Sequence, residues 1–278
     1  KINQGSRTGA HQQSSVHVIA SNDIVESVSG GAASGGGTAG VSGAVVVYTG
    51  IKETTARIGD GAQVKAENAI VVLAHSDNQI YANVVGAAVG GTAGVGGSVS
   101  VIVLQDTTTA SVGGSLIANA ITVKAESNEL LELSATAFQA AGTAAVGASV
   151  GTIVFKGKTF AIVRPGTTLT AANGNIIVYA DSKEKVSMTV LGGGAGGTAA
   201  VNGSFAVLVM NVTTQAKVED GTSGNGSSLS ALKGSVTVKA TDTTDLNLNT
   251  GNVVGGGAAA VGAAIEVAVY RNTVTAMI

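Results

Sequence analysis

The sequence predicts an all-β, repetitive β-solenoid, a fold in which successive units of one chain stack on one another. Two observations lead to this prediction: five copies of a unit about 54 residues long fill the chain, and apolar residues alternate with a period of two within each copy. The composition agrees with both, because the 278 residues include 41 glycines and only one proline. The valines, alanines and glycines of the repeat are the predicted core.

Three columns of identical residues define the unit. In the first copy they are Val18, Val41 and Ala56, separated by 23 and 15 residues. The spacing recurs in every copy, with Val72, Val123, Val178 and Val238 in the first column, Val95, Val146, Val201 and Val261 in the second, and Ala110, Ala161, Ala216 and Ala276 in the third. Only the segment from the alanine to the next valine varies in length, as expected where a chain leaves a stack. We place the units at about residues 1–61, 62–113, 114–166, 167–221 and 222–278, and we expect a piece of a longer array.

Each unit opens with a predicted strand around the first column, at residues 16–20, 70–74, 121–125, 176–180 and 236–240. Its first-column valine and the alanine two residues later are expected to face inward. The position between them tolerates charge and is expected to face water; it holds Ile19, Leu73, Lys124, Tyr179 or Lys239.

A second predicted strand follows the second column. Alternate apolar residues, such as Val95, Val99 and Val103, are expected to be buried, which places Glu266 of the last copy on the opposite face. Threonine-rich runs at residues 107–110 and 213–216 continue as strand, and the Gly-Asp-Gly sequence at residues 59–61 predicts a turn. The third unit departs from this pattern at residues 156–158 and 164–166, where we expect a local irregularity.

The repeat leaves the number of solenoid coils per unit open. Three coils of roughly 18 residues would fit one unit, and a hairpin folded about the glycine-rich segment before the second column, residues 90–94, would give a similar alternation. In either arrangement that segment is expected where two backbones approach closely.

One long stretch per unit has no charged residue: residues 27–51, 78–105, 133–155, 186–216 and 246–265. Their length is compatible with membrane-spanning helices. Their alternation of apolar residues is compatible with membrane β-hairpins. We favour the dry interior of a solenoid, because the stretches are rich in small residues and keep the unit spacing. No membrane-spanning segment is therefore expected.

Candidate chemistry is sparse. His11, His17 and His75 have no spacing that would place two of them on one metal ion. Glu129 with Glu132, and Glu219 with Asp220, are the carboxylate pairs that a glycan-cleaving enzyme could use, but neither pair recurs in other units, so solvated charges are favoured. Asp60 and Asp220 lie beside glycines without the nonapeptide that builds calcium ladders. We predict no catalytic residue, metal or cofactor, and the net charge of −2 gives no reason to expect nucleic acid.

Residues 90–104, 107–113 and 120–127 resemble repeats of very large secreted bacterial adhesins, the leukotoxin-type filamentous adhesins of anaerobic bacteria, which are broadly similar to filamentous haemagglutinins. The resemblance covers nearly the whole chain. It implies a β-helical shaft, export across the outer membrane and a role in attachment; it transfers no binding residue. The absence of cysteine fits a secreted bacterial protein that is stabilised without disulfides.

Three functions follow as hypotheses. The first is the shaft of an extracellular or cell-surface bacterial adhesin that contacts glycans or proteins of host or neighbouring cells. The second is a self-assembling fibre whose solenoid ends stack on one another. The third, least favoured, is a β-helical enzyme acting on glycans. Surface loops on a rigid scaffold are common binding sites, so the binding candidates lie in the longest variable loop: Thr222, Ser223, Asn225, Ser227 and Ser228.

Overall fold

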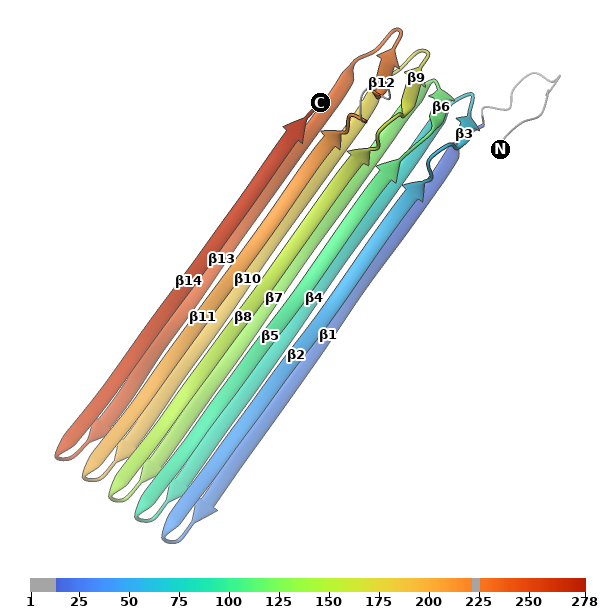
Figure 1. Ribbon diagram of the computed structural model, residues 1–278. Helices are drawn as coiled ribbons and strands as arrows, with labels where there is room; N and C mark the ends of the chain where they lie inside the picture. Colours follow the sequence, from blue (N-terminus) through green and yellow to red (C-terminus); the bar gives the residue numbers. More distant parts are fainter. Residues whose placement is uncertain (1–13, 222–225) are drawn as a thin grey trace.

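The computed structural model describes residues 14–221 and 226–278 and confirms the all-β solenoid. Its strands form three parallel sheets (Figure 1). The first sheet contains β1 (Val16–Gly36), β4 (Ala69–Gly90), β7 (Ala120–Ala141), β10 (Ile176–Gly196) and β13 (Val236–Gly256). The second contains β2 (Ala39–Ile58), β5 (Ala93–Val112), β8 (Ala144–Val163), β11 (Ala199–Val218) and β14 (Ala259–Met277). The third contains the short strands β3 (Gln63–Lys65), β6 (Ser115–Ala118), β9 (Thr168–Ala171) and β12 (Ser228–Ala231).

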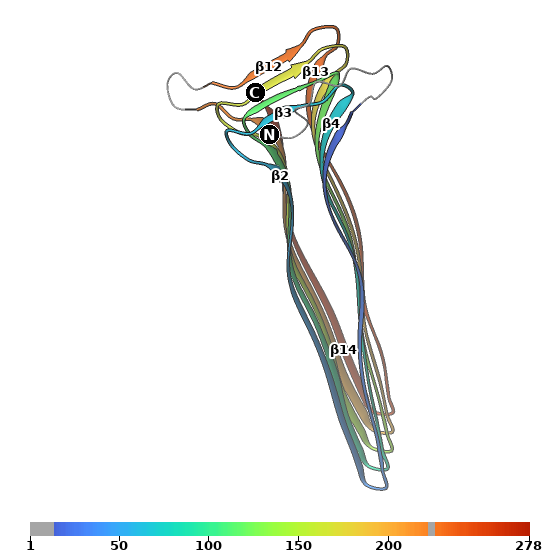
Figure 2. The same cartoon turned by 90° about the vertical axis from the view of Figure 1, so that its right-hand side faces the viewer.

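Each of the first four described coils uses one strand from each sheet, and the fifth consists of β13 and β14. The chain runs along the first sheet, reverses through a two-residue arch and returns along the second sheet, and the short third-sheet strand leads to the next coil. Figure 2 shows the two long sheets running close together and diverging at the end that the third sheet closes. The unit therefore makes one coil folded as a long hairpin, and not three coils of 18 residues.

All three predicted columns stack in register. Val18 pairs with Val72, Val41 with Val95 and Ala56 with Ala110, and the pairing continues through every later coil. The arches stack as well, because the Thr92 amide donates to the Thr38 carbonyl at 2.8 Å. The variable lengths fall in the segments that hold the third-sheet strands. The third unit is regular, contrary to expectation: β8 is 20 residues long, as are β5 and β11.

The core has two apolar clusters. One lies where the three sheets meet and contains Val72 and Ala110; the other lies farther along the two long sheets and contains Ile102 and Phe155. The first and third columns face inward as predicted: Val72, Val123, Val178, Ala110, Ala161 and Ala216 are fully buried. Ile19, which stands at the intervening position, is 58 % exposed, as expected.

The prediction that the second column is buried is wrong. Val41, Val95, Val146, Val201 and Val261 point outward and are 69, 44, 45, 47 and 58 % exposed. Inner positions of the same strands hold small residues, because the two sheets lie so close that a Cβ on Gly86 would stand 2.5 Å from the carbonyl oxygen of Gly97. Glu266 shares its row with the buried Ala206, so it lies on the inner face of its sheet.

The charge-free stretches are the arch of each coil and the adjoining parts of its two long strands. Their inner positions are small nearest the arch and larger farther from it, as at Ile102 and Phe155, while their outer positions carry exposed valines. Among residues 14–221 and 226–278 there is no helix with the length and hydrophobicity needed to cross a membrane.

Candidate functional site

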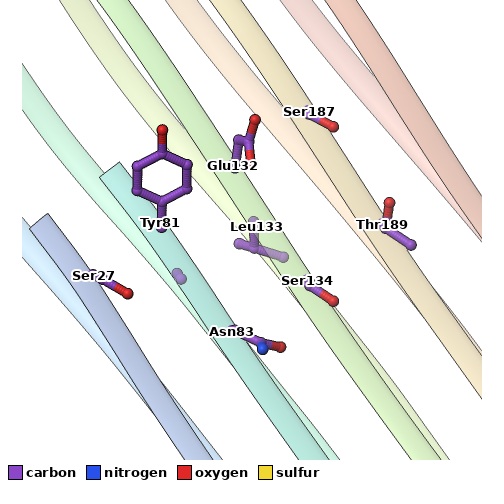
Figure 3. Close-up of a pocket in the computed structure, with 9 residues that line it drawn as sticks. Ser27, Tyr81, Asn83, Glu132, Leu133, Ser134, Ser187 and Thr189 are labelled. Carbon is purple, nitrogen blue, oxygen red and sulfur yellow. The ribbon is translucent and has the colours of Figure 1, made fainter. Parts of the chain in front are cut away.

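The outer face of the first sheet carries two adjacent rows of polar side chains. Because parallel in-register strands bring equivalent residues side by side about 4.8 Å apart, Ser27, Tyr81, Glu132 and Ser187 form one row, and Asn83, Ser134 and Thr189 form the next. These residues line a shallow hollow of about 490 Å³ (Figure 3). Four strands, β1, β4, β7 and β10, contribute to it.

The hollow offers hydrogen-bonding groups around one aromatic ring. The Tyr81 hydroxyl donates to Gln79 Oε1 at 3.2 Å, which fixes the tip of the ring on its own strand. Glu132 lies beside Tyr81 on the neighbouring strand, while Leu133 points into the core below (Figure 3). Hydroxyl, amide and carboxylate groups next to a ring can bind a polar ligand.

Toward the third sheet the same outer face is charged. Lys124 and Lys239 flank the Tyr179 ring, with their Nζ atoms 5.6 and 5.4 Å from its centre. His75 lies between two carboxylates, 3.8 Å from Asp23 Oδ1 and 3.8 Å from Glu126 Oε2. His75 is half-buried and His17 is exposed on this sheet, whereas His11 lies outside the described residues.

A belt of polar side chains crosses the interior between the two apolar clusters. Its buried members are Thr54, Ser76, Asn78, Asp106, Thr108, Ser127, Glu129, Thr159, Ser182, Glu184 and Thr214. The belt is hydrogen-bonded from coil to coil: Asn78 accepts from Lys52 Nζ at 3.0 Å and donates to Glu129 at 2.8 Å. Farther along, the Thr244 hydroxyl donates to Glu184 at 3.3 Å and to Asp242 at 3.0 Å.

Burial changes the acidity of the carboxyl groups in the belt. Removal from water raises the pKa of Glu129 well above its usual range, and the negative charge of Asp106 adds to the effect. Burial also raises the pKa of Asp106, although hydrogen bonds from Thr108 and Ser127 oppose the shift. Burial also raises the pKa of Glu184, to about 7, and the negative charge of Asp242 contributes to the rise. Perturbed carboxyls can mark an active site; Asp106, Glu129 and Glu184 are 1, 3 and 2 % exposed.

The carboxylate pairs considered in the sequence do not form. Glu129 is 3 % exposed and points inward, whereas Glu132 points outward from the same strand. The two side chains lie on opposite faces because they are an odd number of residues apart along the strand. The expectation that Glu129 is a solvated charge was therefore wrong. Glu219 instead forms an ion pair with Lys217 at 2.6 Å.

The turn aspartate Asp60 forms ion pairs with two arginines. Its Oδ2 lies 3.2 Å from Arg57 and 3.0 Å from Arg164 of a later coil. Within the described ranges no three acidic or histidine side chains gather closely enough to hold a metal ion.

The loop candidates for binding divide into two groups. Thr222, Ser223 and Asn225 lie outside the described residues. Ser227 and Ser228 belong to the stack: the Ser227 hydroxyl donates to the carbonyl oxygens of Arg164 and Glu219 at 2.9 and 2.8 Å, and Ser228 opens β12. Of the polar rows of the hollow, only Glu132 was considered from the sequence, and only as part of a carboxylate pair. Comparing equivalent residues across the copies, at fixed distances after the first column, would have found the others.

Comparison with known proteins identifies no relative. No family model matches the sequence, and neither a curated protein nor a solved structure is similar to it.

Proposed function

We propose that this chain is a non-enzymatic structural segment of an extracellular bacterial adhesin, and that it attaches through its outer faces. The observation that carries the proposal is the unbroken in-register stacking of every long strand, which places equivalent surface positions of successive coils side by side. Such a lattice can hold many weak contacts at once, and multivalency then raises the overall affinity.

The dimensions favour contact through a face. A strand of 20 residues is about 66 Å long, whereas each coil adds only about 4.8 Å along the stack. The described coils thus form a broad plate, which is longer along its strands than along the direction in which the coils stack. A plate suits the display of repeated side chains better than it suits a thin spacer.

The hollow around Tyr81 is the part of that surface we propose as the attachment site. Its hydroxyl, amide and carboxylate groups come from four adjacent strands whose positions are set by backbone hydrogen bonds. This fixed spacing fits a polar ligand with repeated hydrogen-bonding groups, such as a surface glycan of a host or neighbouring cell. The acidic groups with altered pKa lie inside the solenoid, which supports a role other than glycan hydrolysis.

The experiment is binding of the purified chain to immobilised glycans and extracellular-matrix proteins, with multivalent display on beads. The double variant Tyr81→Ala/Asn83→Ala should lose most of the binding, while Thr109→Ala on the outer face of the second sheet should keep it. Equal binding by both variants would remove the hollow from the proposal. Hydrolysis of any glycan by the wild-type chain would overturn the non-enzymatic assignment.

A self-assembling fibre is the second candidate. Among the described strands, β1 and β13 of the first sheet and β2 and β14 of the second each have a partner on one side only. Unpaired strand edges are templates for another chain. Electron microscopy over a hundredfold range of concentration tests this function: objects that lengthen along the stacking direction support a fibre, and objects of constant length exclude it.

A further inference from the structure

The outer face of the second sheet is apolar near the arch. Five parallel rows of side chains cover it, and none of their members is charged. The rows, each read from β2 to β14, are Val41, Val95, Val146, Val201 and Val261; Gly43, Gly97, Ala148, Gly203 and Ala263; Val45, Val99, Val150, Phe205 and Ile265; Val47, Val101, Thr152, Val207 and Val267; Thr49, Val103, Val154, Val209 and Val269. We call this surface the valine face.

The valine face reaches the upper end of the size range of the largest apolar patches on typical monomers. Five strands at about 4.8 Å and nine residues at about 3.3 Å per step give a plane of roughly 24 by 26 Å, or about 600 Å². Contiguous apolar areas of this size mark interaction sites on soluble proteins. The exposure is not confined to the outermost coils, because Val146 in the third coil is 45 % exposed and Val201 in the fourth is 47 % exposed.

We infer that the valine face binds the valine face of a second copy of this chain. Two such faces would together bury about 1,200 Å², which reaches the range of specific protein–protein interfaces. A two-fold axis brings the same patch of both copies together, so a flat face of identical ladders is complementary to itself. Two sheets packed face to face lie about 10 Å apart, which is the distance that interdigitating valines require.

The valine face has a groove that fits this pairing. The row of Gly43, Gly97, Ala148, Gly203 and Ala263 forms a groove between two rows of larger side chains. At Gly43 the groove is open, since a Cβ there would meet nothing within 4 Å. At Gly203 the groove is narrowed by the ring of Phe205. A valine row of the second copy can enter the groove in the coils where it is open.

The border of the face is polar, as in known interfaces. The next row away from the arch contains Gln105, Lys156, Asn211 and Arg271, and in the first coil Ile51. On the opposite side of the solenoid, the first sheet carries the polar hollow around Tyr81. One face of the plate is therefore left for a ligand while the other pairs with a second copy.

The test is the mass of the full chain by sedimentation equilibrium between micromolar and hundred-micromolar concentration. The wild type should change from one chain mass, 26.9 kDa, to twice that value as concentration rises. Val146→Lys/Val201→Lys, which buries two like charges in each face, should stay monomeric. Ser134→Lys/Thr189→Lys adds the same charges to the outer face of the first sheet in the same two coils and should dimerise as the wild type does.

A milder variant keeps the test valid if the lysines disturb folding. Val146→Thr/Val201→Thr retains β-branched residues and should weaken the dimer at least tenfold without changing circular dichroism. A wild type that is monomeric throughout, or a dimer that both lysine variants weaken equally, overturns the inference. A second experiment measures sedimentation with phosphatidylcholine vesicles. If the wild type is monomeric and sediments with the vesicles, and Val146→Lys/Val201→Lys does not, a lipid surface is the occupant of the valine face. That result overturns the pairing of copies.

Discussion

Asp106 and Glu129 lie on facing sheets and share one hydroxyl group as a hydrogen-bond partner. Ser127 Oγ is 3.1 Å from Asp106 Oδ2 and 3.1 Å from Glu129 Oε1. The three residues come from two successive coils, so the contact joins the first sheet to the second and one coil to the next. A buried polar group costs stability unless it is hydrogen-bonded, and the belt therefore fixes the stacking register as well as the distance between the sheets.

Loss of the shared hydroxyl should be costly. Ser127→Ala removes the hydroxyl group that two buried carboxyl groups share, and we expect the free energy of unfolding to fall by about 1–3 kcal/mol. Ser134→Ala on the outer face of the same strand is the matched control, with an expected change below about 0.5 kcal/mol. Urea unfolding followed by circular dichroism measures both. Equal stability of the two variants would show that the belt does not contribute.

Glu184 should make stability depend on pH. Its pKa rises to about 7 in the folded chain from an ordinary value near 4.5, so the folded state holds a proton that the unfolded state releases between these values. The stabilisation is complete below about pH 4.5 and is lost as the pH rises through 7. At 1.36 kcal/mol per pKa unit, the loss is about 3 kcal/mol.

Glu184→Gln isolates this effect, because its amide stays neutral. Between pH 4 and 8 the stability of the variant should improve relative to wild type by about 3 kcal/mol. Glu132→Gln on the exposed face should follow the wild-type profile. The prediction fails if the wild type and Glu184→Gln lose stability in parallel over this range.

The spacing of the repeat could be predicted because parallel strands in register place residues at a constant separation on top of one another. Val18, Val41 and Ala56 recur at fixed intervals for this reason, and all three stack as expected. The choice of the inner face could not be predicted for the second column. A period of two separates two faces without saying which is buried, and the usual preference for burying valine gave the wrong answer for Val41.

The sites were harder to predict than the fold. Glu129 carried no signal of burial, because its row contains Ile24, Asn78, Glu184 and Thr244 and thus mixes apolar, polar and acidic residues. The hydrogen-bond partners of its Oε1, Asn78 and Ser127, come from two different coils. Side-chain hydrogen bonds of this kind depend on the distance between sheets, which local sequence does not encode.

Phe155 should be among the side chains most important for stability. It is 2 % exposed in the second apolar cluster, and its ring lies beside Gly157, where a Cβ would stand 2.9 Å from the ring. Phe155→Ala leaves a cavity and should cost about 3–5 kcal/mol. Phe138→Ala on the outer face, where the ring is 53 % exposed, should cost less than about 1 kcal/mol. Chemical unfolding of both variants compares a buried and an exposed phenylalanine, and similar losses would contradict the assignment of inner and outer faces.

Two glycines with left-handed backbone separate conformational strain from steric exclusion. Gly61 has φ of 70° and open space where a side chain would stand, because a Cβ there would meet nothing within 4 Å. Gly114 has φ of 84°, and a Cβ there would collide with the carbonyl oxygen of Ala62, which accepts the 2.7 Å hydrogen bond from the Ser115 amide.

Gly61→Ala should therefore cost only the strain of a left-handed alanine, about 1–2 kcal/mol. Gly114→Ala adds a clash with backbone and should lose the Ser115 hydrogen bond, so its cost should be about twice as large or more. Unfolding free energies give the comparison, and hydrogen exchange of the Ser115 amide should quicken in Gly114→Ala alone. If the two substitutions cost the same, the third-sheet strands can shift apart freely, and the contact between the first two coils at this corner does not constrain the stack.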